Sequence, residues 1–529
     1  MLASAGSRPA PIDPVWESNP FRRVRSVPRW IIACATAIAA LSLLPLLFVV
    51  GVTLGTPLGT IAGLLLRGRI AELLVNTGLL VALAVPLCVV VGAGLAWVTE
   101  RTDLPGRKVW SVLAVAPLAI PAFVQSYAWT SLIPGLHGLW AAVFLSVIAY
   151  FPFVFLPTAA ALRRLSPDVE EVAASLGLPP RAVFMRVVVP HLAPATAAGG
   201  LLVGLHLLAE YGLYAMLRFD TFTTAIFDQF QSSYNGPAAN MMASVLIVLS
   251  LILLGMAARI GRHGRLARVG PGATRAAPRN RGKWTLILAT LLPLTATVCA
   301  LVVPLLTVFR WLVLGDPAEW GLWRIASTLE NTVLLGCIGA TIAVVAALPV
   351  SWLSARMRGS LVRVMEGASY TAAALPGIVV ALGLVTISLA LVPSMYQTFA
   401  TLLLAYLVLF LPRALAGLRT GFAQVPPELE WVAASLGIRP GTVFRKITLR
   451  LAAPSLAAAA ALVFLAIVNE LTATLLLAPI GTRTLATQFW ALTGELDYAA
   501  AAPFAAVMIA LSLPLSALLY WQSFRAAGR

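Results

Sequence analysis

The chain has 529 residues, of which 60% are hydrophobic and only 11% are charged, with a formal net charge of +17. Soluble globular domains carry about 25% charged residues, so the composition excludes a soluble domain and indicates a polytopic membrane protein. A basic chain can bind nucleic acid, but the positions of the charges decide against that partner.

Twelve largely apolar windows are long enough to cross about 30 Å of hydrocarbon as helices. Six lie in each half of the chain, with centres near Leu41, Val85, Ile120, Phe151, Leu205, Ile247, Thr297, Ala340, Val379, Leu407, Phe464 and Ile509. The predicted fold class is therefore an all-α polytopic membrane protein with about 12 transmembrane helices.

The basic residues alternate between the two sides of these windows. If the amino terminus is cytoplasmic, 31 of the 37 Lys and Arg residues fall in segments on the cytoplasmic side, a set that includes Arg413. This asymmetry is the positive-inside rule, so we expect both termini to be cytoplasmic. The basic balance then reflects topology and contact with membrane lipid, and we expect no nucleic-acid partner.

The two halves repeat each other. Asn76 and Asn331, and likewise Pro121 and Pro376, are 255 residues apart, whereas Glu210 and Glu470 are 260 apart. An even number of spans per half makes the copies parallel. We expect a cytoplasmic leader (1–29), a first half (30–260) with a polar loop (166–194), a basic linker (261–283), and a second half (284–529) with a polar loop (425–454).

The polar loops carry nearly the same motif, Val169-Glu-Glu-Val-Ala-Ala-Ser-Leu-Gly177 and Leu429-Glu-Trp-Val-Ala-Ala-Ser-Leu-Gly437. Acidic residues early in each motif complement the positive end of a helix, and the closing glycine ends it. Proline then begins a second short helix. Two short helices at a glycine elbow suit docking on another protein; the alternative is a pair of helices resting on the membrane surface.

These loops resemble the EAA motif of permease subunits of binding-protein-dependent ATP-binding-cassette (ABC) importers, Glu-Ala-Ala, three residues, then Gly. The second copy departs from the motif, because Trp431 replaces its Glu and Arg450 the proline that ends it. The resemblance implies a type I ABC importer permease fold. It assigns ATPase coupling to Glu170, Glu171, Ala173, Ala174, Gly177, Glu430, Ala433, Ala434 and Gly437.

A fused pair of permease halves resembles the ferric-iron-uptake permeases in particular, with the fused thiamine permeases as near relatives. The segments Leu118-Ala-Ile-Pro-Ala-Phe-Val124 and Glu210-Tyr-Gly212 favour the iron branch. The resemblance implies two ABC ATPase subunits that bind ATP and Mg on the cytoplasmic side. It also implies a soluble substrate-binding protein outside a bacterial inner membrane, and no cofactor in this chain. Polyamine or phosphonate are further cargo alternatives.

Glu210 and Glu470 are the exceptions to an apolar interior. Each lies in the fifth span of its half, where a carboxylate is costly unless it faces a water-filled path or a partner. With neighbours Tyr211 and Asn469 they form either a translocation path or a gate. Their hard oxygen ligands suit a transient contact with Fe(III), and no firm metal site is expected.

Other function classes find little support. The chain lacks a Gly-x-x-x-x-Gly-Lys-Ser/Thr segment, so ATP hydrolysis is expected in a separate subunit, and the chain itself is not expected to be an enzyme. A secondary transporter also has parallel halves, but the repeated cytoplasmic loops would then be unexplained. An intramembrane enzyme would need a nucleophile or metal constellation that the sequence does not show.

Overall fold

The computed structural model describes residues 28–57, 59, 63, 67–165, 167–231, 236–263, 283–317, 320–357 and 359–525. The predicted leader lies outside these residues except at its end. The basic linker also lies outside these residues except at its edges. Ser166, at the start of the first loop, lies outside them as well.

Every regular element within the described ranges is helical. The first half contains α1 (Arg29–Leu54), α3 (Gly68–Arg101), α4 (Arg107–Leu113), η2 (Ala116–Ala119), α5 (Ala122–Leu132), α6 (Gly138–Tyr150), α7 (Pro152–Arg164), α8 (Pro167–Ser175), α9 (Pro180–Val183), η3 (Phe184–Val188), α10 (Val189–Ala209), α11 (Gly212–Met216), α12 (Phe222–Gln231) and α13 (Gly236–His263).

The second half repeats this order. It contains α14 (Lys283–Thr297), η4 (Val298–Val302), α15 (Val303–Leu314), α16 (Leu322–Arg356), α17 (Ser360–Thr371), η5 (Ala372–Ala374), α18 (Gly377–Leu391), η6 (Pro393–Met395), α19 (Phe399–Gln424), α20 (Pro427–Ser435), α21 (Pro440–Val443), η7 (Phe444–Thr448), α22 (Leu449–Val468), α23 (Thr472–Leu477), α24 (Leu485–Gly494) and α25 (Tyr498–Arg525).

The described residues contain 9 helices that are long and apolar enough to cross a membrane, or up to 12 if each bent helix pair is one span. The prediction of an all-α fold with about 12 transmembrane helices is confirmed. The position of Arg413 differs from the expectation: it was counted with the cytoplasmic charges, but it lies midway along α19, inside a candidate span.

Three of the spans are broken, and proline explains where. The bends are 91° before α5, 41° between α6 and α7, and 105° before α18. Pro121, Pro152 and Pro376 stand at these breaks. Proline lacks an N–H and pushes the residue before it out of the helical region, so Ile120 and Leu375 are extended.

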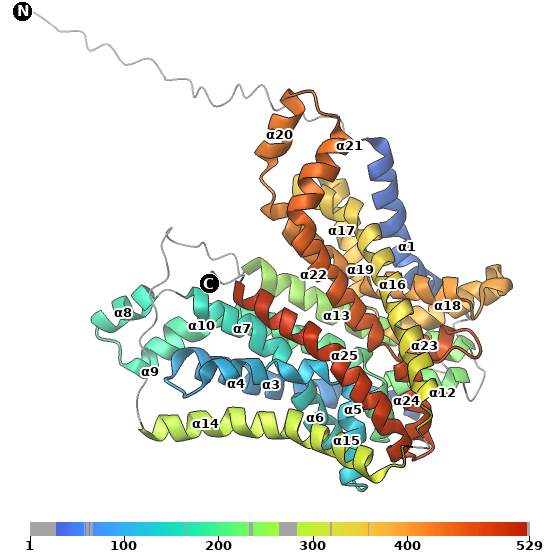
Figure 1. Ribbon diagram of the computed structural model, residues 1–529, viewed down its shortest axis with the longest axis horizontal. Helices are drawn as coiled ribbons and strands as arrows, with labels where there is room; N and C mark the ends of the chain where they lie inside the picture. Colours follow the sequence, from blue (N-terminus) through green and yellow to red (C-terminus); the bar gives the residue numbers. More distant parts are fainter. Residues whose placement is uncertain are drawn as a thin grey trace, which may run out of the picture.

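The first helix of each half packs on the other half. Figure 1 shows α1 beside α17, and α14 and α15 beside the early helices of the first half. The Ser42 hydroxyl of α1 donates to the carbonyl of Ala368 in α17 at 3.4 Å. In the reverse direction, Gln125 of α5 donates to the carbonyl of Ala300 at 2.8 Å. Ala300 lies in the π-helical turn η4, whose wider winding disturbs the usual carbonyl pairing.

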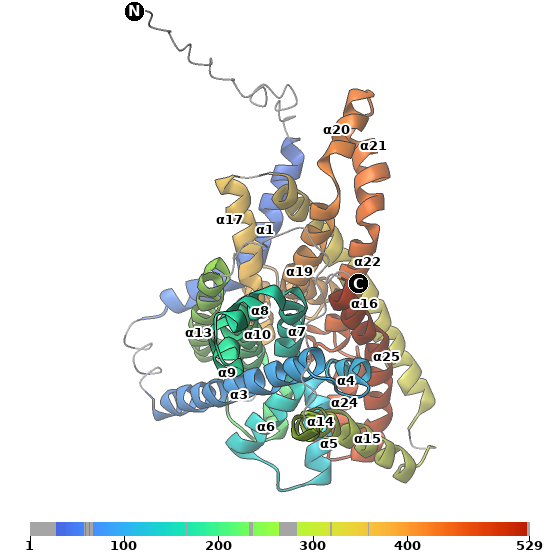
Figure 2. The same cartoon turned by 90° about the vertical axis from the view of Figure 1, so that its left-hand side faces the viewer.

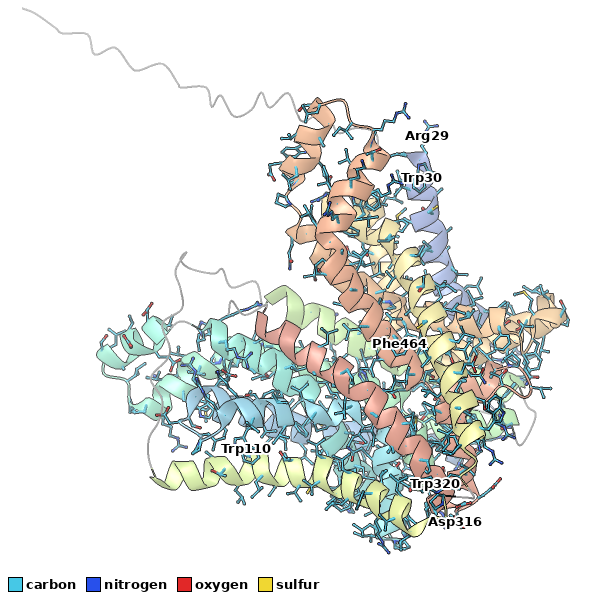
Figure 3. The ribbon with its side chains drawn as sticks, viewed as in Figure 1. Arg29, Trp30, Trp110, Asp316, Trp320 and Phe464 are labelled. Carbon is cyan, nitrogen blue, oxygen red and sulfur yellow. The ribbon has the colours of Figure 1, made fainter. Side chains whose placement is uncertain are left out.

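Figure 3 places Arg29 and Trp30 at one end of the molecule and Asp316 and Trp320 at another, with Phe464 between them. Phe464 lies near the carboxyl end of α22. Small residues let the long helices approach closely. A β-carbon on Gly336 of α16 would lie 2.8 Å from the ring of Phe464, so α16 and α22 are in contact there.

Candidate coupling loops and translocation path

The two polar loops fold alike. Helices α8 and α20 each have nine residues and begin with proline, whose fixed φ suits the first helical position. Each is followed by a turn and a second short helix, α9 or α21. In Figures 1 and 2 the α8–α9 and α20–α21 units stand apart from each other at the margins of the bundle.

A glycine elbow ends each first loop helix. Gly177 has φ +85° and Gly437 has φ +76°, which is the left-handed region that glycine adopts without a steric penalty. The amides of the residues that follow, Leu178 and Ile438, donate to the carbonyls of Ala173 and Ala433 at 3.3 and 3.1 Å. This is the Schellman arrangement that closes a helix.

Each loop helix has an apolar outer face. The exposed side chains recur at the same spacing in both copies: Val169 and Val172 in α8 with Leu176 directly after it, and Leu429 and Val432 in α20 with Leu436 directly after it. Leu176 is 78% exposed and Leu436 is 73% exposed. The alanines of the inner face, Ala173 and Ala433, are buried. Such stripes are typical of surfaces that another molecule covers.

The predicted coupling residues divide between these two faces. Glu171 and Ala174 are exposed, whereas Ala434 is half-buried. Glu170 and Glu430 turn inward, where each pairs with an arginine at the end of a long span. Glu170 Oε1 lies 2.9 Å from Arg101 Nη2, and Glu430 Oε1 lies 2.9 Å from Arg356 Nη2.

The second copy has further contacts around its glutamate. Arg356 also donates to the carbonyl of Val425 at 3.0 Å, and the Thr448 hydroxyl donates to Glu430 Oε1 at 2.8 Å. Thr448 belongs to the π-helical turn η7, which has a counterpart in η3 at the same place after the first loop. The π-helical turns join each loop to the fifth span of its half.

The deep carboxylates lie where the fifth spans break. The first break separates α10 from α11 at Glu210 and Tyr211, and the second separates α22 from α23 between Asn469 and Leu471. The side chain of Leu471 lies 3.0 Å from where a β-carbon on Gly212 would stand, so the two breaks are in contact. This contact joins the two halves of the chain at the middle of the fold.

Glu210 is held on both carboxylate oxygens. Tyr150 donates its hydroxyl to Oε2 at 2.5 Å, and the Leu213 amide donates to Oε1 at 3.0 Å. The Glu210 carbonyl, freed by the break, accepts from the Thr223 hydroxyl at 2.6 Å. Backbone groups inside a membrane need such partners because no lipid can supply them.

Glu470 has a different neighbour. Its Oε1 accepts from the Ala473 amide at 3.0 Å, as Glu210 does from Leu213. Among the described residues no tyrosine donates a hydrogen bond to it, although Tyr406 interacts with it electrostatically. The carboxylate lies against Gly377 at the start of α18. The guanidinium of Arg413 interacts electrostatically with this carboxylate, and it also acts on His206 of the first half. The Arg413 side chain is exposed, and it interacts with one group from each half.

The two predicted neighbours play unequal parts. The Tyr211 ring packs on Phe227 and reaches Trp490 of the second half, with centroid distances of 4.4 and 5.4 Å. Asn469 donates weakly to the Ser512 hydroxyl at 3.4 Å, and its Oδ1 is buried without a partner. Within the described part of the chain no group of three His, Cys, Asp or Glu could hold a metal ion.

Sequence reasoning missed several of these residues. Arg101 and Arg356 are 255 residues apart, so the internal repeat contained the signal that would have found them. Tyr150 and Gly377 had no such signal, because Ala405 and Ala122 stand at the corresponding positions. The contact between Tyr150 and Glu210 therefore exists in the first half only, and the contact between Gly377 and Glu470 exists in the second half only.

Paired loops outside a helical bundle, with polar groups at breaks inside it, define an integral membrane transport subunit. The chain belongs to the binding-protein-dependent transport system inner membrane component family, whose model matches residues 55–265 and 339–527. The predicted resemblance to permease subunits of this kind is confirmed.

Individual relatives support the family assignment. An Fe(3+)-transport system permease protein, FbpB 2 of Haemophilus influenzae, is 34% identical over 493 residues, which cover 92% of this chain and 97% of the relative. The sulfate transport system permease protein CysT of Escherichia coli is 31% identical over 31% of this chain and 67% of its own length. The trehalose transport system permease protein SugB of Mycobacterium tuberculosis is 34% identical over 28% of this chain and 53% of its own length.

Proposed function

We propose that this permease is the membrane subunit of an ATP-driven importer for ferric iron, and that its two polar loops are the contacts for two ATPase subunits. The observation that carries the proposal is the matched apolar stripe on α8 and α20. Both stripes point away from the side of the helix that packs on the bundle. An apolar face of this kind needs a covering partner, and two equivalent faces need two equivalent partners.

The ATPase subunits would supply the nucleotide site. ATP with Mg would bind in these partners, and this chain would contribute no cofactor or catalytic residue of its own. The positive-inside pattern assigns both termini, the leader 1–29 and the linker 261–283 to the cytoplasm. A soluble binding protein would deliver the cargo to the opposite side, in keeping with the family description.

Ferric iron as cargo rests on the relative that aligns along nearly the whole chain. The sulfate and trehalose permeases align over about a third of it. The carboxylates of Glu210 and Glu470 are hard oxygen groups that suit a transient contact with Fe(III). Since no cluster of metal ligands occurs among the described residues, the path would pass the ion on without retaining it.

Docking can be tested by changing the apolar stripes. Leu176→Asp with Leu436→Asp should abolish co-purification of the ATPase, because a charge on each face cannot be desolvated. Leu176→Met with Leu436→Met keeps the faces apolar and should retain it. Retention of the ATPase by the double aspartate variant would reject the loops as docking sites.

The cargo needs a separate measurement. Uptake of radiolabelled ferric iron and of labelled thiamine should be compared in cells with and without this gene under iron limitation. Loss of iron uptake alone is the expected result. Loss of thiamine uptake alone, or of neither, would reject iron as the cargo while leaving the docking result intact.

A further inference from the structure

We propose that Arg101 and Arg356 are positioning residues that tie each loop helix to a long span, so that movement of the loop reaches the far end of that span. The inference rests on the proposed function, because it concerns how loops that bind an ATPase act on the path. The arginines touch neither a docking face nor a deep carboxylate directly.

The ion pairs join equivalent residues of the two halves and are withdrawn from solvent. The Arg356–Glu430 pair is also a hydrogen bond, whereas Arg101 and Glu170 are paired by distance without one. The Arg101 side chain is 4% exposed and that of Arg356 is 12% exposed, while their glutamate partners are 20% and 18% exposed. Removing one member of such a pair leaves a poorly solvated charge without a partner, which is strongly unfavourable. The ion pair therefore gives each loop helix a connection to a long span, in addition to the chain that continues from the loop into the fifth span.

Each arginine stands at one end of a long helix, and an asparagine near the other end of that helix makes a contact of its own. Arg101 is the last residue of α3 and Arg356 the last residue of α16. Near the opposite ends, Asn76 donates to the Asp220 carbonyl at 3.1 Å and Asn331 donates to the Arg483 carbonyl at 3.2 Å. The 25 residues from asparagine to arginine span roughly 38 Å as an α-helix.

Both far-end contacts lie just beyond the broken fifth spans. Asp220 follows α11, and Arg483 follows α23. In the first half, the segment after Asp220 also contacts the deep site, because the Thr223 hydroxyl donates to the Glu210 carbonyl. The route thus runs from loop helix to arginine, along a long helix, to the segment after the break.

The direct chain connection between loop and path is less regular. It passes through the π-helical turns η3 and η7, a winding that is rare and occurs at sites where helices adjust. A loop that moved only through this connection could change the π-turn without moving the fifth span. The ion pair to α3 or α16 gives the movement a second route, through one continuous helix in each half.

The second half offers the sharper experiment. A fluorescent probe on Ile480→Cys, in a chain without the native cysteines, would report on the far end, since Ile480 is 91% exposed in the segment between α23 and α24. In the reconstituted complex with its ATPase, ATP binding should change the probe signal. Arg356→Gln should reduce that change several-fold while the ATPase stays bound and hydrolyses ATP. Arg356→Lys, which keeps the charge opposite Glu430, should restore most of it.

Arg419→Gln is the control within the same half. Arg419 forms an ion pair with Glu366 that joins α19 to α17. Its variant should leave the probe response unchanged. Thr448→Val is a milder variant, since valine already stands at the equivalent position 188. It removes a donor to Glu430 without changing a charge and should weaken the response.

The outcomes separate cleanly. An unchanged response in Arg356→Gln, or in Thr448→Val should the first variant fail to insert, would overturn the proposal. So would an equal loss in Arg419→Gln, which would indicate general destabilisation. Loss of ATPase binding in Arg356→Gln would show that the arginine takes part in docking. That outcome would also overturn the proposal. Failure of the unsubstituted chain to bind the ATPase would instead reject the proposed function.

Discussion

Glu470 lies against Gly377: a β-carbon built on Gly377 would stand 3.0 Å from the Oε1 atom of the glutamate. The glycine is the first residue of α18, immediately after the 105° bend. Since Ala122 occupies the corresponding place in the first half, only the second carboxylate can rest directly on the backbone of a bent span.

Gly377→Ala should therefore move the Glu470 carboxylate or the bend. Overpacking of this kind costs about 1–3 kcal/mol when neighbours cannot relax, and we expect slower uptake with normal insertion. Uptake kinetics and membrane abundance check the result. Gly367→Ala in α17, where nothing lies within 4 Å of a β-carbon, is the control and should behave as wild type. Equal uptake by both variants would show that the contact has no role.

Tyr150→Phe should resemble Glu210→Gln in its effect on transport. The phenol is the donor to Glu210 Oε2. Loss of a hydrogen bond to a carboxylate costs about 1.5–3 kcal/mol. Tyr127→Phe is the control, because the Tyr127 hydroxyl donates to the carbonyl of Tyr498 at 2.6 Å and to neither deep carboxylate. Uptake rate and basal ATP hydrolysis are the measurements; a Tyr150 variant indistinguishable from the control would contradict the assignment.

The double variant Glu210→Gln with Glu470→Gln tests the deep pair as a whole. Both carboxylates cap the short helix that follows them, and glutamine keeps an acceptor oxygen for that bond. We expect insertion to be normal while uptake or basal ATP hydrolysis changes. Unaltered kinetics would reduce the two glutamates to helix capping.

Gly177→Val and Gly437→Val should uncouple ATP hydrolysis from transport. A β-branched residue at positive φ costs about 1–2 kcal/mol or more, which the Schellman turn cannot absorb. The first loop should tolerate the change less well, because it retains the motif glutamate Glu171, which Trp431 replaces in the second. The measurement is the amount of substrate moved per ATP hydrolysed. Gly441→Val, at a helical glycine with free space around it, is the control.

The sequence was enough to predict the parts of the fold that repeat. Long apolar runs fixed the spans, and glycine after Ala-Ser-Leu fixed the elbows at Gly177 and Gly437, because both signals are local. The breaks at Glu210 and Glu470 were not predicted as breaks, since the polar residue alone does not reveal that the helix stops.

Contacts between distant residues were harder to predict. The resemblance to the EAA motif assigns Glu170 and Glu430 to ATPase coupling. The structure turns them toward arginines about 70 residues earlier in the chain, a pairing that no local pattern encodes. The positive-inside pattern places Arg413 among the cytoplasmic charges. In the structure it lies midway along α19 with an exposed side chain and interacts electrostatically with Glu470.

The packing of the first helix of each half on the other half has a consequence for biosynthesis. Helix α1 leaves the ribosome first, yet Ser42 finds its partner Ala368 only 326 residues later. At about 5–20 residues per second, translation of that stretch takes roughly 16–65 s. During this time α1 can pack on α13 of its own half, where the Thr53 and Ser244 hydroxyls share a hydrogen bond of 2.7 Å, but the face that packs on α17 has no partner yet. The packing of the first half is therefore completed only after the second half is inserted.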